Sequence, residues 1–351
     1  MTTPVSATSY SVRSFFPLLS FNHGCSYPTL SRNSFSLSHF YFPNTHFRLT
    51  DNYDGRKRVS SSLLPLRALQ DSAAANEQEN DNEELAVLFA MRSEYNDIVI
   101  VDSPKARYLL LDSTNNVHSI YNKVEKWTDS YWDEFACLPA VIPQGPVALL
   151  GLGGGTAAHL LLGLWPSLQL EGWEIDRILV DQAREYLELS ALEQRNQDGG
   201  VLNIHVGDAF SPSAVVPGGF AGIVVDLFSD GKVLSQLQEV ETWLELSKRL
   251  MPNGRFMVNC GGANPKESNI GDENVCHGDS VWLHNSTIEA LCKAFPGNLN
   301  WKKLSEREGA NYMALTGPMP DLNAWASLLP DRLRSNLGQW RPCKFGEQQM
   351  L

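Results

Sequence analysis

The chain has 351 residues and a formal net charge of −12, with 40 acidic against 28 basic side chains. Phosphate backbones and anionic membrane surfaces repel a protein of this sign, so we expect neither nucleic-acid binding nor attachment to a membrane surface. The six cysteines are scattered and form no CxxC pair, which argues against a zinc ribbon or a dithiol redox motif. We therefore predict no metal site.

The N-terminal segment has the composition of a targeting sequence. Residues 1–50 contain no Asp or Glu, are rich in Ser, and carry Arg13, Arg32 and Arg48 as their only fixed charges. Arg without acid in a Ser-rich segment is typical of an organelle transit peptide. We predict a transit peptide over residues 1–70 that directs the protein to the chloroplast stroma, with the mitochondrion as the alternative. Its removal would take away seven basic and two acidic side chains and shift the formal net charge to −17.

The next part of the chain predicts a small β-domain. Residues 71–85 are acidic, polar and free of aromatic side chains, which indicates a flexible leader. Over residues 86–140 the segments DIVIVDS, ARYLLLD and NVHSIYN are β-branched or aromatic runs separated by turn residues, as in short strands. A short helix within Tyr131–Leu138 is expected to end at Pro139.

Strand and helix patterns alternate from residue 141 to residue 318. The segments VALLGL, LQLEGWEID, VLNIHVGDAF, AGIVVDLFSD and GRFMVNCGG are strand candidates separated mostly by helical segments, which predicts an α/β fold with a mostly parallel sheet covered on both faces. NLNWKKLSE and ANYMALTGP predict an antiparallel hairpin at its edge, and residues 319–351 a helical tail. The uncharged residues 146–165 approach membrane-spanning length, but three successive glycines disfavour a continuous helix, so we predict no membrane span.

Three motifs follow successive strands of the predicted parallel sheet, where open α/β sheets bind ligands. Gly151-Leu152-Gly153-Gly154-Gly155 stands between a strand and a helix, where glycine permits tight turns and close approach of a ligand. Glu174 ends the second strand, where an acid can accept hydrogen bonds from ribose hydroxyls. Asp208 follows the third strand, where it can accept from the amine of an adenine. Together these motifs predict a nucleoside site, although each alone fits a structural turn or a surface acid.

The fourth strand ends in Asp226-Leu227-Phe228-Ser229-Asp230. Two carboxylates on a loop at the ligand edge can hold a cationic group or take a proton from an amine. The competing interpretation is a turn or helix N-cap built by Asp226 or Asp230.

Residues from about Tyr95 to Gly317 resemble the spermidine synthase family of polyamine aminopropyltransferases. The shared order is SEYNDIVIVDS, RYLLLD, YWDEFACLP, a GGG loop, EID, GDAF and an Asp-containing strand end. The resemblance implies a small N-terminal β-domain followed by a Rossmann-like domain of the class I methyltransferase type, and a homodimer. It also implies a co-substrate, either decarboxylated S-adenosylmethionine or S-adenosylmethionine itself, and no metal.

The resemblance assigns roles to particular residues. Asp226 would be the catalytic acid-base group, and Tyr131 would bind or deprotonate the incoming amine. Asp133 and Asp230 would contact the acceptor. The co-substrate would contact the glycine loop and the residues that follow the next two strands, namely Gly151, Gly153, Gly154, Gly155, Thr156, Glu174, Ile175, Asp208 and Ala209.

The sequence also departs from the family. Thr156 stands where the family has an Asp that grips the aminopropyl amine, and Leu227 and Phe228 stand where it has small polar residues. Cys137 replaces a His of the family's helix. Three functions therefore remain open. They are aminopropyl transfer to an amine, methyl transfer from intact S-adenosylmethionine to a small-molecule acceptor, and nucleoside binding without catalysis.

Overall fold

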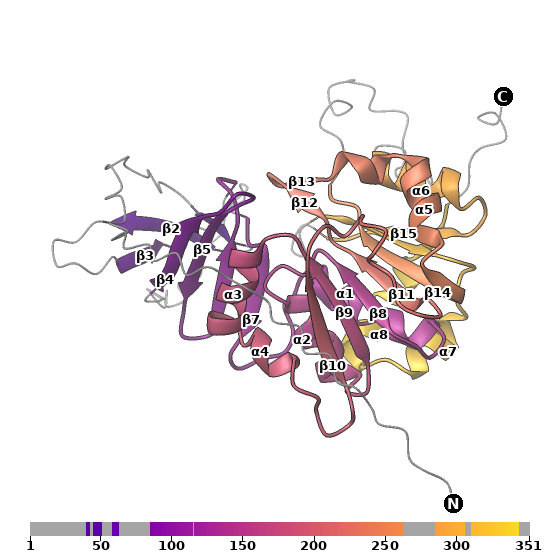
Figure 1. Ribbon diagram of the computed structural model, residues 1–351, viewed down its shortest axis with the longest axis horizontal. Helices are drawn as coiled ribbons and strands as arrows, with labels where there is room; N and C mark the ends of the chain where they lie inside the picture. Colours follow the sequence, from indigo (N-terminus) through magenta and orange to yellow (C-terminus); the bar gives the residue numbers. More distant parts are fainter. Residues whose placement is uncertain are drawn as a thin grey trace, which may run out of the picture. The chain divides into compact units, whose positions relative to one another are not determined.

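The computed structural model describes residues 85–114, 116–262, 285–305 and 310–343, together with the backbone of three strands between residues 40 and 62. These residues form two large sheets and one short hairpin (Figure 1). Each sheet follows from the residue patterns of its part of the chain.

The first sheet has seven antiparallel strands in chain order. Its strands are β1 (Phe40–Phe42), β2 (Thr45–Thr50), β3 (Arg58–Ser62), β4 (Leu85–Arg92), β5 (Asp97–Asp102), β6 (Ala106–Leu110) and β7 (Ser119–Asn122). β5, β6 and β7 coincide with the three strand segments predicted from the sequence. In β5 the apolar side chains of Ile98 and Ile100 point into the core, as expected for a half-buried strand.

Strands β1–β3 lie within residues 1–70, which we predicted to be a transit peptide outside the folded part. These three strands extend the same sheet N-terminally of residue 86, where we placed the start of the small β-domain. Only Arg58 and Val59 pair with β4, through Ala86 and Leu85. Cleavage of residues 1–70 stays a prediction, and residues 63–84, which include most of the predicted leader, lie outside the described residues.

The second sheet has eight strands in the order β10-β9-β8-β11-β14-β16-β15-β17. The five strands from β10 to β14 are parallel, and the pairings of β14, β16, β15 and β17 are antiparallel. The mostly parallel α/β sheet and the antiparallel pair of β15 and β16 are confirmed, but β17 and not this pair forms the edge of the sheet. The strands are β8 (Val147–Leu150), β9 (Gln169–Glu174), β10 (Val201–Val206), β11 (Phe220–Val225), β14 (Leu250–Asn259), β15 (Leu299–Lys303), β16 (Tyr312–Thr316) and β17 (Arg341–Pro342).

Helices cover both faces of this sheet. Val147 and Leu149 of β8 belong to one buried cluster, whereas Ala148 and Leu150 belong to another, as the twofold alternation of a strand requires. The first cluster includes side chains of α1 (Trp132–Phe135), α2 (Thr156–Leu164), α3 (Arg177–Tyr186), α4 (Leu189–Leu192), α7 (Leu322–Ser327) and α8 (Asp331–Arg334). The second includes side chains of α5 (Val240–Ser247) and α6 (Ser286–Ala294).

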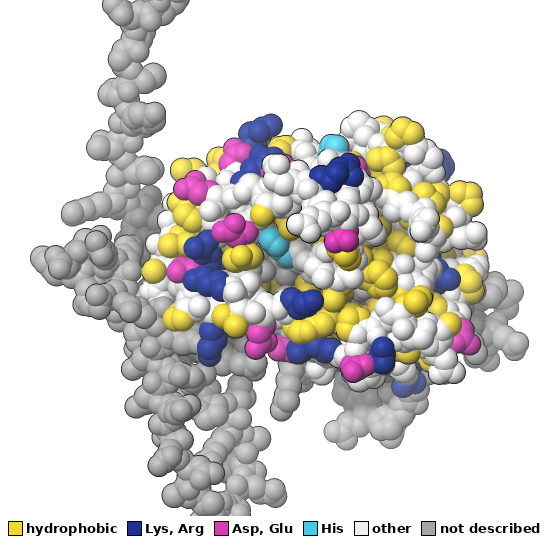
Figure 2. Space-filling view, turned by 90° about the horizontal axis from the view of Figure 1, so that it is seen from below, with side chains coloured by type: hydrophobic (Ala, Val, Ile, Leu, Met, Phe, Trp, Pro, Cys, Tyr) yellow, Lys and Arg dark blue, Asp and Glu magenta, His cyan; other side chains and the backbone are white. Residues whose placement is uncertain are grey.

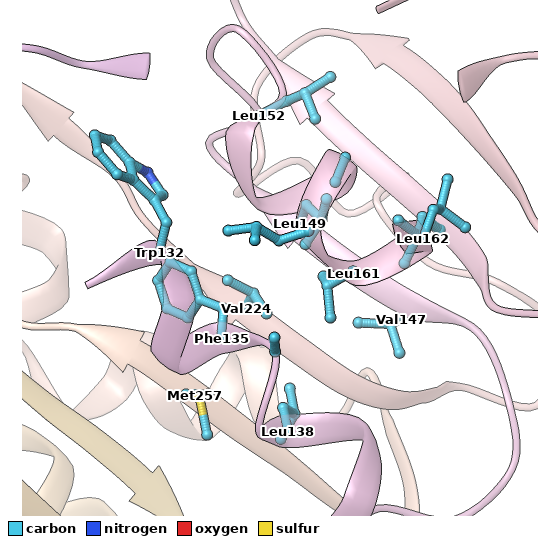
Figure 3. Close-up of a cluster of buried hydrophobic side chains, with 14 of the residues drawn as sticks. Trp132, Phe135, Leu138, Val147, Leu149, Leu152, Leu161, Leu162, Val224 and Met257 are labelled. Atoms are coloured by element: carbon cyan, nitrogen blue, oxygen red, sulfur yellow. The ribbon is translucent and has the colours of Figure 1, made fainter. Parts of the chain in front are cut away.

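The segment around α1 is anchored deeply in the first cluster. Trp132, Phe135 and Leu138 are all almost fully buried, and they belong to the same buried cluster as side chains of β8 and α2 (Figure 3). Glu134 of α1 also forms a buried ion pair with Lys302 of β15, at 2.5 Å. The predicted short helix is therefore one turn long, and Pro139 lies in a following 3₁₀ turn at Leu138–Val141. This packing fixes Tyr131, which precedes α1.

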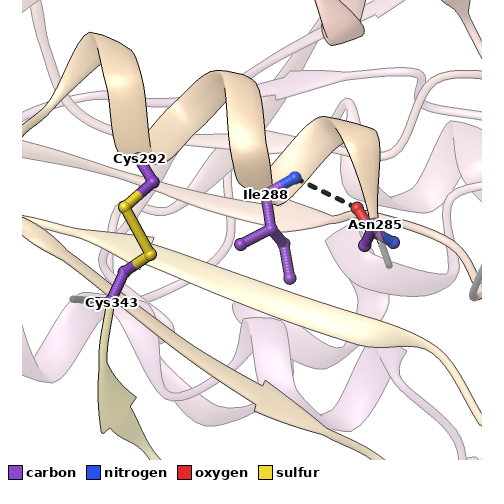
Figure 4. Close-up of a disulfide and its surroundings, with 4 residues drawn as sticks. All are labelled: Asn285, Ile288, Cys292 and Cys343. Carbon is purple, nitrogen blue, oxygen red and sulfur yellow. Dashed lines mark hydrogen bonds between the residues drawn. A yellow bond between two sulfur atoms is a disulfide. The ribbon is translucent and has the colours of Figure 1, made fainter. Parts of the chain in front are cut away.

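A disulfide ties the C-terminal part of the described chain to α6. Cys292 of α6 and Cys343, which follows β17, are bonded, and both are buried (Figure 4). Asn285 is the N-cap residue of the same helix, and its side-chain oxygen accepts from the Ile288 backbone N–H. The predicted helical tail thus contains α7 and α8, but also a short strand and a disulfide that no cysteine spacing indicated.

In the described part of the chain, no helix has the length and apolar character needed to cross a membrane. The uncharged segment 146–165 contains β8, a glycine turn and α2. On the face shown in Figure 2, basic and acidic side chains are interspersed among apolar ones instead of forming one continuous basic surface.

Candidate functional site

A cavity of about 920 Å³ opens at the carboxyl ends of the parallel strands. Its walls include the residues that follow β8, β9, β10, β11 and β14. The order of the parallel strands reverses at β8, which lies between β9 and β11. Ligands of open α/β sheets bind at such a switch point, so the cavity stands where the fold predicts it.

The glycines of the loop fall into two groups, because two of them line the cavity and the other two serve contacts within the protein. Gly151 and Gly153 line the cavity and have left-handed backbone angles, with φ of 86° and 54°. A Cβ on Gly151 would collide with the Asp226 carbonyl, which explains the need for glycine there. Gly154 and Gly155 are absent from the cavity wall. The Gly154 N–H donates to Ser119 Oγ at 2.8 Å, and Gly155 is the N-cap residue of α2.

Glu174 lies at the end of β9 and faces the cavity beside the glycine loop. Its Oε2 accepts from the Gly153 N–H at 2.9 Å, and its Oε1 accepts from the Asp176 N–H at 3.1 Å. Burial raises the pKa of this carboxyl, although the backbone donors lower it in part. Each oxygen keeps a second lone pair for a ligand hydroxyl. Ile175 also lines the cavity and is 42% exposed.

Asp208 and Ala209 follow β10 and line the same cavity. Asp208 Oδ1 accepts from the Phe210 N–H at 2.8 Å, so the carboxylate shapes its own turn. Arg249 holds this turn from behind, because its guanidinium donates to the Ala209 and Phe210 carbonyls at 2.6 and 2.8 Å. The predicted adenine-binding segment is therefore fixed by a residue 40 positions further along the chain.

Asp226 follows β11 and is held by neutral donors. Tyr131 Oη donates to its Oδ2 at 3.1 Å, and Asn259 Nδ2 donates to its Oδ1 at 2.9 Å. Burial raises the pKa of Asp226 to about 6, although these hydrogen bonds favour the charged form. A carboxylate with this pKa accepts a proton readily near neutral pH.

Tyr131 is a hydrogen-bond donor in this arrangement. Burial, followed by the charge of Asp226, raises its pKa well above the ordinary value. The phenol therefore stays protonated at neutral pH, and the group beside it that can take a proton is Asp226.

Three further predicted site residues, besides Gly154 and Gly155, lie outside the described cavity wall. Thr156 is 3% exposed, and its hydroxyl exchanges hydrogen bonds with the Ile120 backbone, so it faces β7. Asp133 accepts from the Thr128 and Asp129 backbone N–H groups and holds the loop before α1. Asp230 is exposed at the tip of a hairpin. These side chains build turns and contacts within the protein, and their roles toward a ligand stay predictions.

Several residues that contribute to the site were not predicted from the sequence. Asn259 fixes Asp226 from the end of β14, and the only sequence signal is a polar residue closing an apolar strand. Asp176 caps α3 and accepts from Ser93 at 2.5 Å and Asn96 at 2.8 Å, which ties the β4–β5 turn to the cavity. His118 lines the cavity and contacts Asp112 at 3.2 Å. The described residues contain no cluster of three or more His, Cys, Asp or Glu suited to a metal ion.

The strand order, the glycine loop after the first parallel strand and the cavity at the switch point define a Rossmann-like α/β protein of the methyltransferase type. No protein-family model matches the chain. A probable polyamine aminopropyl transferase of Bifidobacterium longum (strain NCC 2705) is 26% identical over 203 residues, which are 56% of this chain and 43% of that protein. The match therefore spans less than half of that relative, and it supports the resemblance to the spermidine synthase family.

Two solved structures align with part of this chain. A spermidine synthase in complex with the transition-state analogue AdoDATO has a TM-score of 0.49 and 15% identity, over 74% of this chain and 92% of that one. Human methyltransferase-like protein 13 in complex with SAH has a TM-score of 0.42 and 18% identity, over 63% of this chain and 97% of that one.

Proposed function

We propose that this protein is a transferase that uses an S-adenosylmethionine-type nucleoside and passes its aminopropyl group to an amine. The observation that carries the proposal is the placement of Asp226. Its carboxylate, held by Tyr131 and Asn259, lines the same cavity as Gly151, Gly153 and Glu174. The cavity thus combines a proton acceptor with the nucleoside motifs.

The transfer needs little from the protein beyond alignment and removal of one proton. The amine lone pair attacks the aminopropyl carbon that is bonded to the sulfonium sulfur. The bond between this carbon and sulfur breaks, with its electrons going to sulfur. The sulfonium becomes a neutral thioether, and the proton of the new ammonium passes to Asp226. Glu174 would hold the ribose hydroxyls and Asp208 the adenine amine, as expected from their places at the strand ends.

Methyl transfer from intact S-adenosylmethionine is the second candidate, and the orientation of Thr156 favours it. The spermidine synthase family, which this chain resembles, has an Asp at this position. That Asp would repel the carboxylate of intact S-adenosylmethionine. Here the side chain is a hydroxyl bonded to the Ile120 backbone. This barrier to the intact nucleoside is therefore missing.

The test is turnover of decarboxylated S-adenosylmethionine with amines, followed by mass spectrometry of the thioether and of the alkylated amine. We expect Asp226→Asn to lower kcat at least about 100-fold, because a positioned base contributes roughly this much. Asp230→Asn is the matched control, since it makes the same change of charge on the exposed hairpin turn. Full turnover by Asp226→Asn would contradict the assignment of the base, and methylated products from intact S-adenosylmethionine would establish the second candidate.

A further inference from the structure

The segment after Asp226 folds back as a small hairpin beside the cavity. Strands β12 (Phe228–Ser229) and β13 (Lys232–Val233) pair antiparallel, with Asp230 and Gly231 as the two turn residues. Both turn residues have positive φ, 49° and 69°, as two-residue hairpin turns of Asp-Gly sequence require. The second acid of the Asp226–Asp230 segment therefore builds the turn and leaves the cavity wall to its neighbours.

The hairpin presents apolar side chains to the cavity. Leu227 lies against the glycine loop, since a Cβ on Gly151 would be 3.2 Å from its Cδ2. Phe228 and Val233 are cross-strand partners, and both lie beside Gly261, where an added Cβ would be 3.6 and 2.8 Å away. All three side chains line the cavity. They form an apolar wall, Leu227–Phe228–Val233, between the glycine loop and the end of β14.

The charged side chains beside this wall are unsuited to an acceptor that carries several ammonium groups. Asp226 is the one carboxylate on this side among the described lining residues, because Glu174 and Asp208 stand at the ends of β9 and β10. Lys232 of the hairpin also lines the cavity and adds a positive charge. A second ammonium placed beside the apolar wall would lose hydration without gaining a carboxylate partner among the described lining residues, and Lys232 would repel it.

We infer that the acceptor is a monoamine with an apolar or aromatic body and no second ammonium. Its amine would face Asp226 and its body would pack on the apolar wall. The inference rests on the proposed aminopropyl transfer, and it distinguishes this cavity from one built for a polyamine.

Binding of two amines to the nucleoside-loaded protein tests the inference separately from turnover. The full chain is saturated with methylthioadenosine and titrated by calorimetry with 2-phenylethylamine and with putrescine. We expect 2-phenylethylamine to bind at least roughly tenfold more tightly, because burial of the ring on the apolar wall favours it. Lys232→Glu should improve putrescine affinity about fivefold to tenfold by replacing a repulsive charge with an attractive one. Lys126→Glu, which changes an exposed lysine outside the cavity wall, should leave both affinities unchanged.

Equal or tighter binding of putrescine by the unmodified chain would overturn the inference, and so would failure of either amine to bind. An unchanged putrescine affinity in Lys232→Glu would also contradict it. If 2-phenylethylamine binds as expected but no product forms with decarboxylated S-adenosylmethionine, the acceptor class stands and the proposed transfer fails.

Discussion

At the scale of single residues, Asp226 combines burial with two side-chain hydrogen bonds. Tyr131 and Asn259 donate to the carboxylate, which favours its ionised form, yet burial still leaves its pKa at about 6. The ionised carboxylate is therefore a cost to the folded state at neutral pH. Groups with this property are enriched at functional sites.

This cost predicts a pH-dependent effect on stability. The folded-state pKa of about 6 exceeds the ordinary value of 3.8, so the contribution of Asp226 to stability is largest below pH 4 and is lost as the pH rises through 6. Asp226→Asn should accordingly raise the free energy of unfolding at pH 7 by about 1–3 kcal/mol and change it little at pH 4. Urea unfolding at both pH values measures the difference. A lower free energy of unfolding for Asp226→Asn at pH 7 would contradict the raised pKa of Asp226 on which this prediction rests.

The same pKa predicts the pH dependence of catalysis. Below pH 6 the carboxyl is protonated and cannot accept a proton, so kcat/KM should fall about tenfold for each pH unit below this value. The fall in activity and the gain in stability thus have opposite directions on the acid side. An activity that stays constant from pH 5 to pH 7 would exclude Asp226 as the base.

At the scale of elements, α6 and β17 are held together by the disulfide between Cys292 and Cys343, which are 51 residues apart. In the chain-entropy model a loop of this length stabilises the folded state by about 4 kcal/mol, and measured effects are often smaller. The other two cysteines of the described chain, Cys137 and Cys260, are buried and free.

Reduction of the Cys292–Cys343 disulfide should therefore lower the stability of the folded protein. We expect dithiothreitol to lower the free energy of unfolding by about 2–4 kcal/mol in the unmodified chain. The double variant Cys292→Ala/Cys343→Ala should be less stable by a similar amount and insensitive to the reductant. If the reductant still lowers the free energy of unfolding of the double variant, the loss of stability comes from other cysteines and contradicts this prediction.

Most strands and helices of the parallel sheet could be predicted from the sequence, but their contacts could not. The strand–glycine–helix pattern located the loop at Gly151, and the strand ends located Glu174 and Asp208. Local patterns gave no indication that Gly154 bonds to Ser119 or that Thr156 bonds to Ile120, because these partners are 35 and 36 residues away. Asp230 is the exception, since an Asp-Gly pair between short apolar segments is a local hairpin signal.

At the scale of the whole molecule, the site depends on both sheets. The β4–β5 turn reaches Asp176 through Ser93 and Asn96, and β7 reaches the glycine loop through Ser119. Strand β3 pairs with β4 at two register positions. The described contacts that reach the cavity thus come from β4–β7 and the parallel sheet.

A chain that begins at Asp71 should consequently bind the nucleoside as tightly as the full chain. This is also the form that removal of the predicted transit peptide would leave, so we propose that it is the functional one. Titration of both chains with methylthioadenosine, and import of the full chain into isolated chloroplasts, check the two parts of this prediction. A loss of affinity above tenfold in the shorter chain would assign a structural role to residues 1–70.

The most direct test of the account is a calorimetric titration of the protein and of Glu174→Ala with decarboxylated S-adenosylmethionine. We predict binding to the unmodified protein and a loss of roughly 10- to 100-fold in the variant, because hydrogen bonds to a charged group contribute about this much. Folding of the variant is checked by circular dichroism. Binding of equal strength in both proteins, or no binding to either, would contradict the nucleoside site at the ends of β8, β9 and β10.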